Sequence, residues 1–557
     1  MPDTVTADDA EAKLVARYLG ELEKQIGDRA TFESHWQEIA RRLLPRANIF
    51  KRAEWTKGER RTEYVFNSKG PLNLERFAAL FNSLLTPGTQ QWHKLRAKKR
   101  PLNKTIRVKQ YCDDYTNALF EQRYRASANF AAQNMEVLLS SGAFGTGFLF
   151  IDANPAGGWL YKSGHLAQTY LLENAAGRVD RIKRKFKWRA YQAAEKWGRD
   201  ALPAKMQHDL ENSGLQEYEF VHVIEPNPEH NPRMIGPRTM KYTSTYISVE
   251  GRKIMERGGF RTFPVPTTRY VTNINEGYGR GPGMTALPDL KMVNEIDRSV
   301  LRVAQNQGDP PIIAKALGQV SPFQNRPGFK NYGWLSDKGE PLVQYLNVGG
   351  KLDVALKIRE EVEKTLDDIF FITLFQILAD NPQLTATEVL ERAREKGVLM
   401  APFIERAQQE YLGTMIVREI DLLEHSGLAP EMPPELQDDG GRMEIVYESP
   451  LVRAQKAEQG LGFMRVLQAI APLAAGDPTI YQRFNKDEIV PGLAEIHGMP
   501  MAWLHDEQAL AAIQQQATQQ SQQQQMQQAV PQGAAAAKDL AAASQMMNQG
   551  GGGGPIQ

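Results

Sequence analysis

The stretch that decides the fold is PDLKMVNEIDRSVLRVAQNQGDPP, residues 288–311. Proline suits the first turn of a helix, where its missing N–H would have no partner anyway, so Pro288 indicates a helix start. Apolar side chains then recur three or four residues apart, and Pro310 and Pro311 cannot continue the helix. The stretch therefore predicts an amphipathic helix over residues 288–307. Its apolar stripe consists of Leu290, Val293, Ile296, Val300 and Val303.

A second amphipathic helix is predicted downstream, over residues 352–378. Residues 308–351, between the two helices, are rich in Gly, Pro and Asn and contain strand-like pieces at 312–313 and 342–346. The sequence therefore predicts a compact insert carried between two helices. The apolar stripe of the second helix consists of Val354, Ile358, Val362, Leu366 and Ile369.

A short loop and a long helix are predicted over residues 379–429. Pro382 lies in the loop, and Thr385 followed by Glu388 forms a capping box, in which each side chain satisfies a backbone N–H of the first turn. We expect this helix to kink near Pro402, because a proline inside a helix removes a hydrogen bond and clashes with the preceding turn.

The remaining chain divides by its periodicity. The N-terminal part is helical and begins with two predicted helices, 14–26 and 32–43. From about residue 142 to residue 270, short β-prone runs punctuated by Gly and Pro favour a mixed or antiparallel sheet. Residues 450–510 are again helical. The fold class expected from these patterns is α+β, mainly helical.

The C-terminal residues 511–557 consist mostly of Gln, Ala and Gly and carry two charges. Such a segment cannot bury enough apolar surface to offset its ordering entropy, although Gln and Ala are compatible with a helix. We expect either a disordered tail or a helix of a barrel.

The charges of the 557 residues nearly cancel, with 67 Lys and Arg against 66 Asp and Glu. A charged partner must therefore be met by local patches. The single cysteine, Cys112, excludes an intramolecular disulfide and fits a reducing compartment. No run is apolar and long enough to span a bilayer, and the N-terminus lacks the pattern of a signal peptide, so we expect no membrane anchor.

Two stretches concentrate basic side chains, residues 94–109 and residues 181–189. The first holds eight Lys and Arg and no acidic residue, and the second alternates basic with apolar or aromatic side chains. Both could contact phosphates, although surface or subunit contact explains them as well. The alternation in the second also fits a β-strand with one solvated face.

No catalytic or cofactor-binding motif is apparent. Residues 142–147 read GAFGTG, but they lie between a helix and a strand, which indicates a tight turn rather than a nucleotide-binding loop. The sequence has no P-loop, no GxSxG motif and no pair of histidines at metal-ligand spacing. We therefore expect no enzyme activity, catalytic residue, metal or cofactor. One alternative stays open from the residues, a DNA-modifying enzyme that binds substrate through its basic patches.

The order of these parts resembles the portal, or head-to-tail connector, protein of short-tailed bacteriophages. The resemblance extends over about residues 15–430, and its most specific segments are the Leu-Pro-Asp-Leu-Lys and Thr-Ala-Thr-Glu-Val sequences. The matching segments are RLLPR (42–46), LFNSLL-TPG (80–88), GRGP (279–282), ALPDLK (286–291), Asn294-Glu295, DPP (309–311) and QLTATEV (383–389).

The resemblance implies a ring of twelve subunits at one capsid vertex, through which double-stranded DNA is packaged and ejected. It also implies a set of named parts. These are a wing (1–287), a first stem helix (288–307), a clip (308–351), a second stem helix (352–378), a tunnel loop with a kinked wing helix (379–429), a helical crown (430–510) and the tail (511–557).

The same resemblance suggests DNA-facing residues and partners. The tunnel loop would present Asp380, Asn381 and Gln383 to DNA, and the first stem helix would present Arg298 and Arg302. The implied partners are eleven further copies of the chain, the terminase large subunit, a tail adaptor protein, major capsid and scaffolding proteins, and internal core proteins. The protein would be assembled in the host cytoplasm and located in the virion. Another virion structural protein, such as a tail adaptor, stays open as a second alternative.

Overall fold

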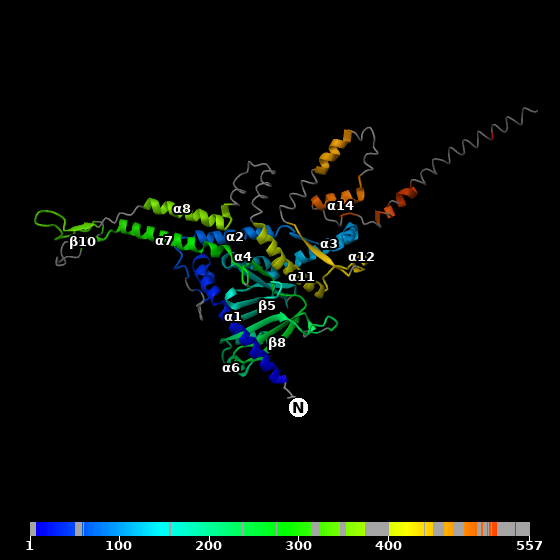
Figure 1. The fold of residues 1–557 in the computed structure, drawn as a ribbon, viewed down its shortest axis with the longest axis horizontal. Coiled ribbons are helices and arrows are strands. Elements are labelled where there is room, and N and C mark those ends of the chain that lie inside the picture. The colour runs from blue at the N-terminus through cyan, green and yellow to red at the C-terminus, as the bar shows by residue number, and fades with distance from the viewer. Residues whose placement is uncertain are drawn as a thin grey trace, which may run out of the picture. The chain divides into compact units, whose positions relative to one another are not determined.

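The structure is a computed structural model, and its fold is shown in Figure 1. Two compact units divide the chain, one of residues 1–92, 118–429 and 447–451, and a second of residues 93–117, 430–446 and 452–557. The described residues are 7–50, 58, 61–154, 157–234, 236, 239–274, 276–314, 323, 324, 326, 328–345, 352–373, 400–438, 440–448, 462–472, 484–497, 503, 504, 509, 510, 512, 513, 515–520 and 541.

A five-stranded antiparallel sheet forms the centre of the first unit, in the order β4-β5-β6-β7-β8. Alternate residues of β6 enter two different cores, because successive side chains of a strand point to opposite faces. Val221 and Val223 pack with helix α1, and Phe220 packs with α5 and α6. The strands are β4 (Thr169–Glu173), β5 (Val179–Arg189), β6 (Glu217–Pro226), β7 (Tyr242–Ser248) and β8 (Lys253–Phe260), and the short helices are α5 (Ala190–Trp197) and α6 (Ala204–Asn212).

Helix α1 (Ala7–Leu43) is one continuous helix of 37 residues. The prediction of two helices was wrong, because Gly27 interrupts the apolar pattern without breaking the helix. Gly27 is exposed, and glycine in a helix interior costs only about 1 kcal/mol relative to alanine. The buried Trp36 near the end of α1 donates its indole N–H to the Phe144 carbonyl at 3.1 Å.

A smaller antiparallel sheet, β3-β2-β9, packs beside helices α2 and α4. The tight turn predicted for residues 142–147 is observed between α4 and β2. Gly145 ends α4 with φ +79°, and a Cβ there would lie 2.4 Å from the Gly279 carbonyl oxygen. Only glycine permits this close approach of two backbones. The elements are α2 (Lys69–Leu85), α4 (Phe130–Phe144), β2 (Thr146–Ala153), β3 (Trp159–Ser163) and β9 (Thr267–Arg269).

Helix α7 (Pro282–Gly308) contains the predicted helix but begins six residues before Pro288. Pro282 occupies the first turn instead, and Pro288 lies inside the helix. A proline there removes a single backbone hydrogen bond, and the helix continues through it. The other helices of this part are α8 (Leu352–Ile369), the π-helical segment η6 (Ala407–Leu412) and α11 (Gly413–His425), and the strands are β10 (Ile312–Ala314) and β11 (Val343–Tyr345).

The second unit pairs two strands from distant parts of the chain, β1 (His93–Ala97) and β12 (Met443–Tyr447). A 3-10 turn η2 (Arg100–Lys104) leads from β1 into α3 (Ile106–Arg123), whose residues from 118 on belong to the first unit. Helix α12 (Pro434–Gln437) precedes β12, so residues 430–510, expected to form a helical crown, also contain a strand. Helix α14 (Lys486–His497) belongs to the same unit.

The described residues confirm a mixed α/β fold with antiparallel sheets. None of the described helices is long and apolar enough to cross a membrane.

Candidate functional site: a helical arm and its anchor

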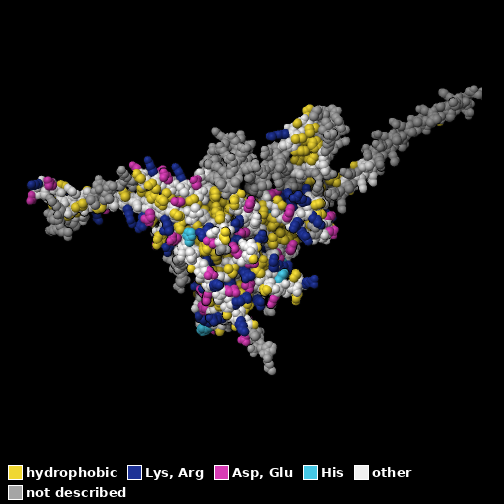
Figure 2. All heavy atoms as spheres, viewed as in Figure 1, with side chains coloured by type: hydrophobic (Ala, Val, Ile, Leu, Met, Phe, Trp, Pro, Cys, Tyr) yellow, Lys and Arg dark blue, Asp and Glu magenta, His cyan; other side chains and the backbone are white. Residues whose placement is uncertain are grey.

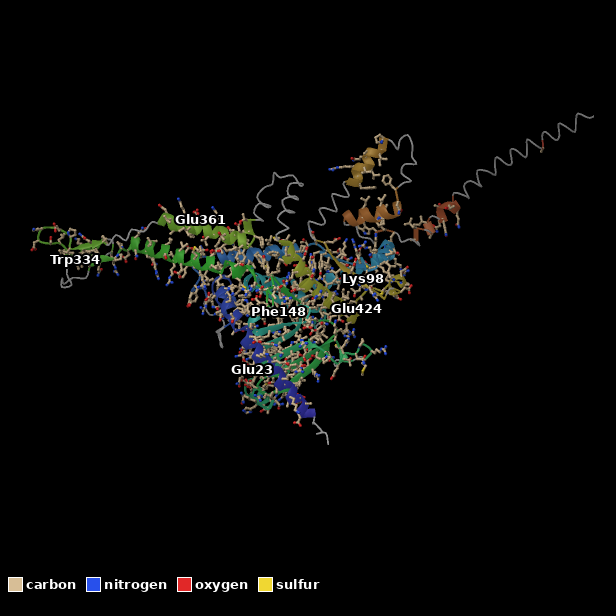
Figure 3. The ribbon with its side chains drawn as sticks, in the orientation of Figure 1. Glu23, Lys98, Phe148, Trp334, Glu361 and Glu424 are labelled. Atoms are coloured by element: carbon tan, nitrogen blue, oxygen red, sulfur yellow. The ribbon has the colours of Figure 1, made fainter. Side chains whose placement is uncertain are left out.

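Helices α7 and α8 lie side by side and form an arm that extends from the rest of the first unit (Figure 1). At its end β10 pairs with β11 in antiparallel register, Ile312 opposite Tyr345. Figure 3 labels Glu361 on α8 and Trp334 near this end. The arm thus corresponds to the helix–insert–helix order that the sequence predicts.

Hydrogen bonds of Asn294 fix the base of the arm to the segment that precedes α2. The buried Asn294 Oδ1 accepts the backbone N–H groups of Phe66 at 2.7 Å and Asn67 at 3.1 Å, and its Nδ2 donates to the Leu290 carbonyl at 2.7 Å. The Asn67 amide in turn donates to Asp297 at 2.7 Å and to Glu363 at 3.0 Å. One polar network therefore joins α7, α8 and residues 66–67.

Ion pairs hold the two helices of the arm to each other and to α2. The Arg359 guanidinium lies 3.4 Å from Asp297 across the helix pair and 3.3 Å from Glu363 on its own helix. Lys69 at the start of α2 lies 2.8 Å from Asp367, which also accepts from the Asn73 amide at 2.8 Å. These half-buried groups hold the base of the arm against α2.

Beyond this anchor, the arm buries little of its apolar surface. All buried residues of α7 lie at or before Asn294. Figure 2 shows hydrophobic side chains along the exposed surface of the arm. A helix pair can bury only the stripe between its two members, so other apolar side chains need a further partner. The large exposed ones are Met292, Leu301, Ile312, Ile313, Phe329, Tyr332, Leu335, Tyr345, Val354, Leu356 and Ile358.

Arg298 and Arg302, the two cations proposed from the sequence, are exposed on α7 one turn apart. Arg298 lies 3.6 Å from Glu295, and its guanidinium carbon is 5.7 Å from the centre of the Phe66 ring. Among the described residues no carboxylate lies within ion-pair distance of Arg302. Asp380, Asn381 and Gln383 lie outside the described residues, as do the capping residues Thr385 and Glu388.

The helix predicted after the loop is described from residue 400 to His425, and it is irregular at a place that the sequence did not indicate. Pro402 is exposed near the start of its described part, whereas residues 407–412 form the π-helical segment η6. The Gly413 N–H donates to the carbonyl of Gln408, five residues earlier, and the Tyr447 hydroxyl donates to the same carbonyl at 2.7 Å. A second donor thus supports the widened turn.

One ion pair holds the helix within η6, and a second, fully buried pair holds it beyond η6. Arg269 of β9 donates twice to Glu410, at 2.9 and 2.8 Å, and also pairs with Glu173. Nine residues after Glu410, Glu419 pairs with Arg123. Both side chains of this second pair are 0% exposed.

Arg123, Glu419 and Tyr161 form a fully buried polar group of the first unit. Arg123 Nε donates to Glu419 Oε1 at 3.0 Å, its Nη2 donates to Oε2, and the Tyr161 hydroxyl donates to Oε1 at 2.6 Å. The guanidinium carbon also lies 4.7 Å from the centre of the Trp92 ring. Burial, followed by the adjacent Glu419 charge, raises the pKa of Tyr161 well above its usual range, so the phenol stays a donor.

His165 is likewise a structural residue. Its Nδ1 accepts the Ala167 N–H at 3.0 Å, and its Nε2 donates to the Ala47 carbonyl at 3.0 Å. These two contacts define a neutral ring with the proton on Nε2. Burial lowers the pKa of His165 to about 4. Within the part of the chain that the structure describes, no group of three or more His, Cys, Asp or Glu could hold a metal ion.

Sequence reasoning missed Asn294, Asn67 and Arg359. Each of these residues contacts a partner more than 60 positions away in the sequence. Such contacts cannot be read from local sequence. One signal was available, since an asparagine interrupts the apolar stripe of α7 directly after Val293. A buried amide at such a position needs hydrogen-bond partners from another segment.

Known proteins are similar to this chain over most of its length. Residues 16–504 match the family model described as bacteriophage head to tail connecting protein. A "Probable portal protein" of Bordetella phage BPP-1 is 24% identical over 498 residues, covering 88% of each chain. A "Portal protein" of Salmonella phage epsilon15 is 23% identical over 491 residues, covering 87% of each.

Two solved structures are also similar to the chain. One is titled "Neck of empty GTA particle computed with C6 symmetry", with a TM-score of 0.36, 12% identity, and coverage of 74% of this chain and 91% of that one. The other is titled "Virion of native gene transfer agent (GTA) particle", with a TM-score of 0.33, 13% identity, and coverage of 82% and 98%.

Proposed function

The chain belongs to the family of bacteriophage head-to-tail connecting proteins, and on this premise we propose that its copies form a portal ring at one vertex of the capsid. The family match and the names of the curated relatives confirm the portal resemblance of the sequence. The protein is therefore a head-tail connector of a phage virion. The proposal concerns the ring, its channel and its partners.

The observation that carries the proposal is the apolar surface of the arm. Leu301 on α7 and Val354 and Ile358 on α8 are each more than 40% exposed. Contiguous exposed apolar surface marks an interaction site. A ring satisfies it, because each arm packs against the arms of the two neighbouring copies through a heterologous interface that closes on itself.

The parts of the ring follow the plan that the sequence suggested. Strands β10 and β11 belong to the clip, which would contact the terminase large subunit during packaging and a tail adaptor protein afterwards. We propose the wing at 1–287, stem helices at 288–307 and 352–378, the clip at 308–351, the tunnel loop and kinked helix at 379–429, the crown at 430–510 and the tail at 511–557.

The channel would carry double-stranded DNA past the first stem helix and the tunnel loop. Arg298 and Arg302 on α7, with Asp380, Asn381 and Gln383 of the loop, are the proposed DNA-facing residues. Glu295 beside Arg298 supports a lining of mixed charge. DNA can slide along such a lining, whereas a purely basic one would hold it at many phosphates.

We propose no catalytic role for the protein itself. The chain has no P-loop, so the energy for moving DNA would come from an ATP-hydrolysing partner. Further partners in this proposal are the major capsid protein, scaffolding protein and internal core proteins, with assembly in the host cytoplasm.

Mass photometry of the purified chain tests the ring. Twelve copies of the 62.6 kDa chain give a particle of about 750 kDa. Leu301→Glu, at 51% exposure, should shift most of the mass to single subunits, since a buried unpaired charge would enter each interface.

Leu215→Glu is the matched control, because Leu215 is 57% exposed but lies outside the arm. It should leave the rings intact. A wild-type protein that stays monomeric at micromolar concentration, or a Leu301→Glu variant with unchanged rings, contradicts the proposal.

A further inference from the structure

The basic stretch at residues 94–109 lies entirely in the second unit, and the proposed channel makes no use of it. Its eight Lys and Arg contrast with the net charge of +1 of the whole chain. They are Lys94, Arg96, Lys98, Lys99, Arg100, Lys104, Arg107 and Lys109. Figure 3 labels Lys98.

The fold presents these cations from a fixed backbone. Along β1, His93, Leu95 and Ala97 are buried, so Lys94 and Arg96 share the opposite, half-buried face. The Asn103 side chain then closes the following turn. Its Oδ1 accepts the Ala97 N–H at 2.9 Å and its Nδ2 donates to the Ala97 carbonyl at 2.8 Å.

The exposed Lys98 and Arg100 lie in the turn that Asn103 closes, and Arg107 follows in the first turn of α3, where no acidic residue offsets it. Lys98 donates its backbone N–H to the Arg442 carbonyl at 3.0 Å, which brings a further exposed arginine to the same place. A cavity of about 150 Å³ is lined by other residues of the same stretch, including Lys94, Arg96, Asn103 and Lys109, and by the acidic Asp113.

In the second basic stretch, by contrast, acidic side chains neutralise most of the basic ones. It forms β5, where Lys183 lies 2.5 Å from Glu21 and Lys185 lies 2.9 Å from Glu219. Lys187 and Arg181 also have carboxylates within 4.0 Å. Four of its six basic side chains thus have a carboxylate within 4.0 Å, whereas Arg184 and Arg189 have none among the described residues.

In the first stretch, four cations are not neutralised in this way. No carboxylate of the described residues lies within ion-pair distance of Lys98, Arg100, Arg107 or Lys109, whereas Lys94, Arg96 and Lys99 have contacts of their own. The unneutralised side chains attract a polyanion from outside the chain.

The composition of the stretch favours the backbone of a nucleic-acid duplex over other polyanions. Protein–protein interfaces are depleted of Lys and enriched in aromatic residues, and residues 94–109 contain no Phe, Tyr or Trp. The same lack of aromatic side chains disfavours single strands, which bind largely by stacking their bases. Phosphates of a duplex need only fixed positive charges.

We propose that residues 94–109, with Arg442, form a surface that binds the phosphodiester backbone of double-stranded nucleic acid without reading its sequence. This surface is separate from the stem and tunnel-loop residues of the proposed channel. It holds DNA by charge alone, so its affinity depends strongly on salt and little on base composition.

The test is fluorescence anisotropy of the full-length protein with a labelled 30-base-pair duplex of arbitrary sequence, at several salt concentrations. The variant K98Q/R100Q/R107Q removes three exposed cations. Each lost phosphate contact should lower the slope of log affinity against log salt by about 0.9, or about 2.7 for three. The conservative variant K98R/R100K/R107K should keep the slope, since phosphates accept either cation.

Two matched variants separate this surface from other basic groups. R181Q/K185Q/K187Q removes three cations of β5 that already have carboxylate neighbours and should leave the slope unchanged. R298Q/R302Q reports on the proposed channel, and mass photometry of the same samples reports ring formation independently.

The proposal is overturned by an unchanged slope in K98Q/R100Q/R107Q. A loss of duplex binding only in R298Q/R302Q also overturns it. Tighter binding of a single-stranded 30-mer than of the duplex refutes the assignment to duplex. If K98Q/R100Q/R107Q loses binding to polyglutamate but not to DNA, the surface is an acidic-protein site and the proposal fails.

Discussion

Replacing Glu419 by Gln tests whether the Arg123–Glu419 pair holds the long helix in place. Gln has nearly the same shape but no charge, so Arg123, which is 0% exposed, loses its counter-ion. The substitution also weakens two hydrogen bonds from Arg123 and one from Tyr161. The lost contacts are thus electrostatic, while the packing around them is kept.

The expected loss of stability follows from this geometry. Removing one partner of a buried ion pair costs about 3–5 kcal/mol, because the remaining charge stays desolvated. For a cooperative unit of a few hundred residues, each kcal/mol lowers Tm by about 2–4 °C. Glu419→Gln should therefore lower Tm by roughly 6–20 °C.

Thermal and urea denaturation followed by circular dichroism measure this effect, at one fixed protein concentration because assembly also shifts Tm. The control is Glu211→Gln, since Glu211 pairs with Arg199 at 2.5 Å but both side chains are 57% exposed. It should change stability by less than about 0.5 kcal/mol. The double variant Arg123→Met/Glu419→Gln should recover part of the loss by removing the unpaired charge.

A loss below about 1 kcal/mol in Glu419→Gln would refute the reasoning. It would mean that Arg123 finds water or another acceptor when the carboxylate is gone. A double variant less stable than Glu419→Gln alone would show that packing of the arginine, and not its charge, carries the stability.

Two further predictions concern a close backbone approach and a buried histidine. In urea denaturation, Gly145→Ala should destabilise the chain by more than Gly177→Ala. Both glycines have positive φ, but only a Cβ at position 145 meets a backbone atom, at 2.4 Å. Equal losses of stability would contradict the proposed clash. The lowered pKa of His165, about 4 against an ordinary 6.5, means that the unfolded chain takes up a proton first as the pH falls. Above pH 6.5 the ring is neutral in both states, and as the pH falls from 6.5 to 4 its protonation in the unfolded chain removes up to about 3 kcal/mol of stability. The difference in unfolding free energy between wild type and His165→Gln should shrink over that window, and a pH-independent difference would refute the argument.

Local periodicity predicted the elements whose residues are neighbours in sequence. The stripes of residues 288–307 and 352–378 correspond to α7 and the described part of α8, and the β-prone runs after residue 142 correspond to an antiparallel sheet. Helix starts were less predictable. Pro282 and Pro288 are both compatible with a first turn, and only the packing of Gly281 against Gly145 selects the earlier one.

Features that depend on distant contacts could not be predicted. Tyr447 donates to a carbonyl of segment η6, and Arg269 pairs with Glu410 within it, so nothing in residues 407–412 alone indicates a π-helix. The two basic stretches looked alike in sequence. They differ because Glu21 and Glu219 reach the charges of β5, whereas the fold brings no described carboxylate to Lys98 or Arg100.

The pairing of β1 with β12 has a consequence for synthesis of the chain on the ribosome. The two strands lie about 350 residues apart, and at roughly 5–20 residues per second β1 waits about 20–70 s for its partner. During that interval the edge of β1 is unpaired in the nascent protein, and another chain could join it. The first unit can begin to fold while the second cannot, so a message truncated before codon 443 would leave a product with a folded sheet and an open edge.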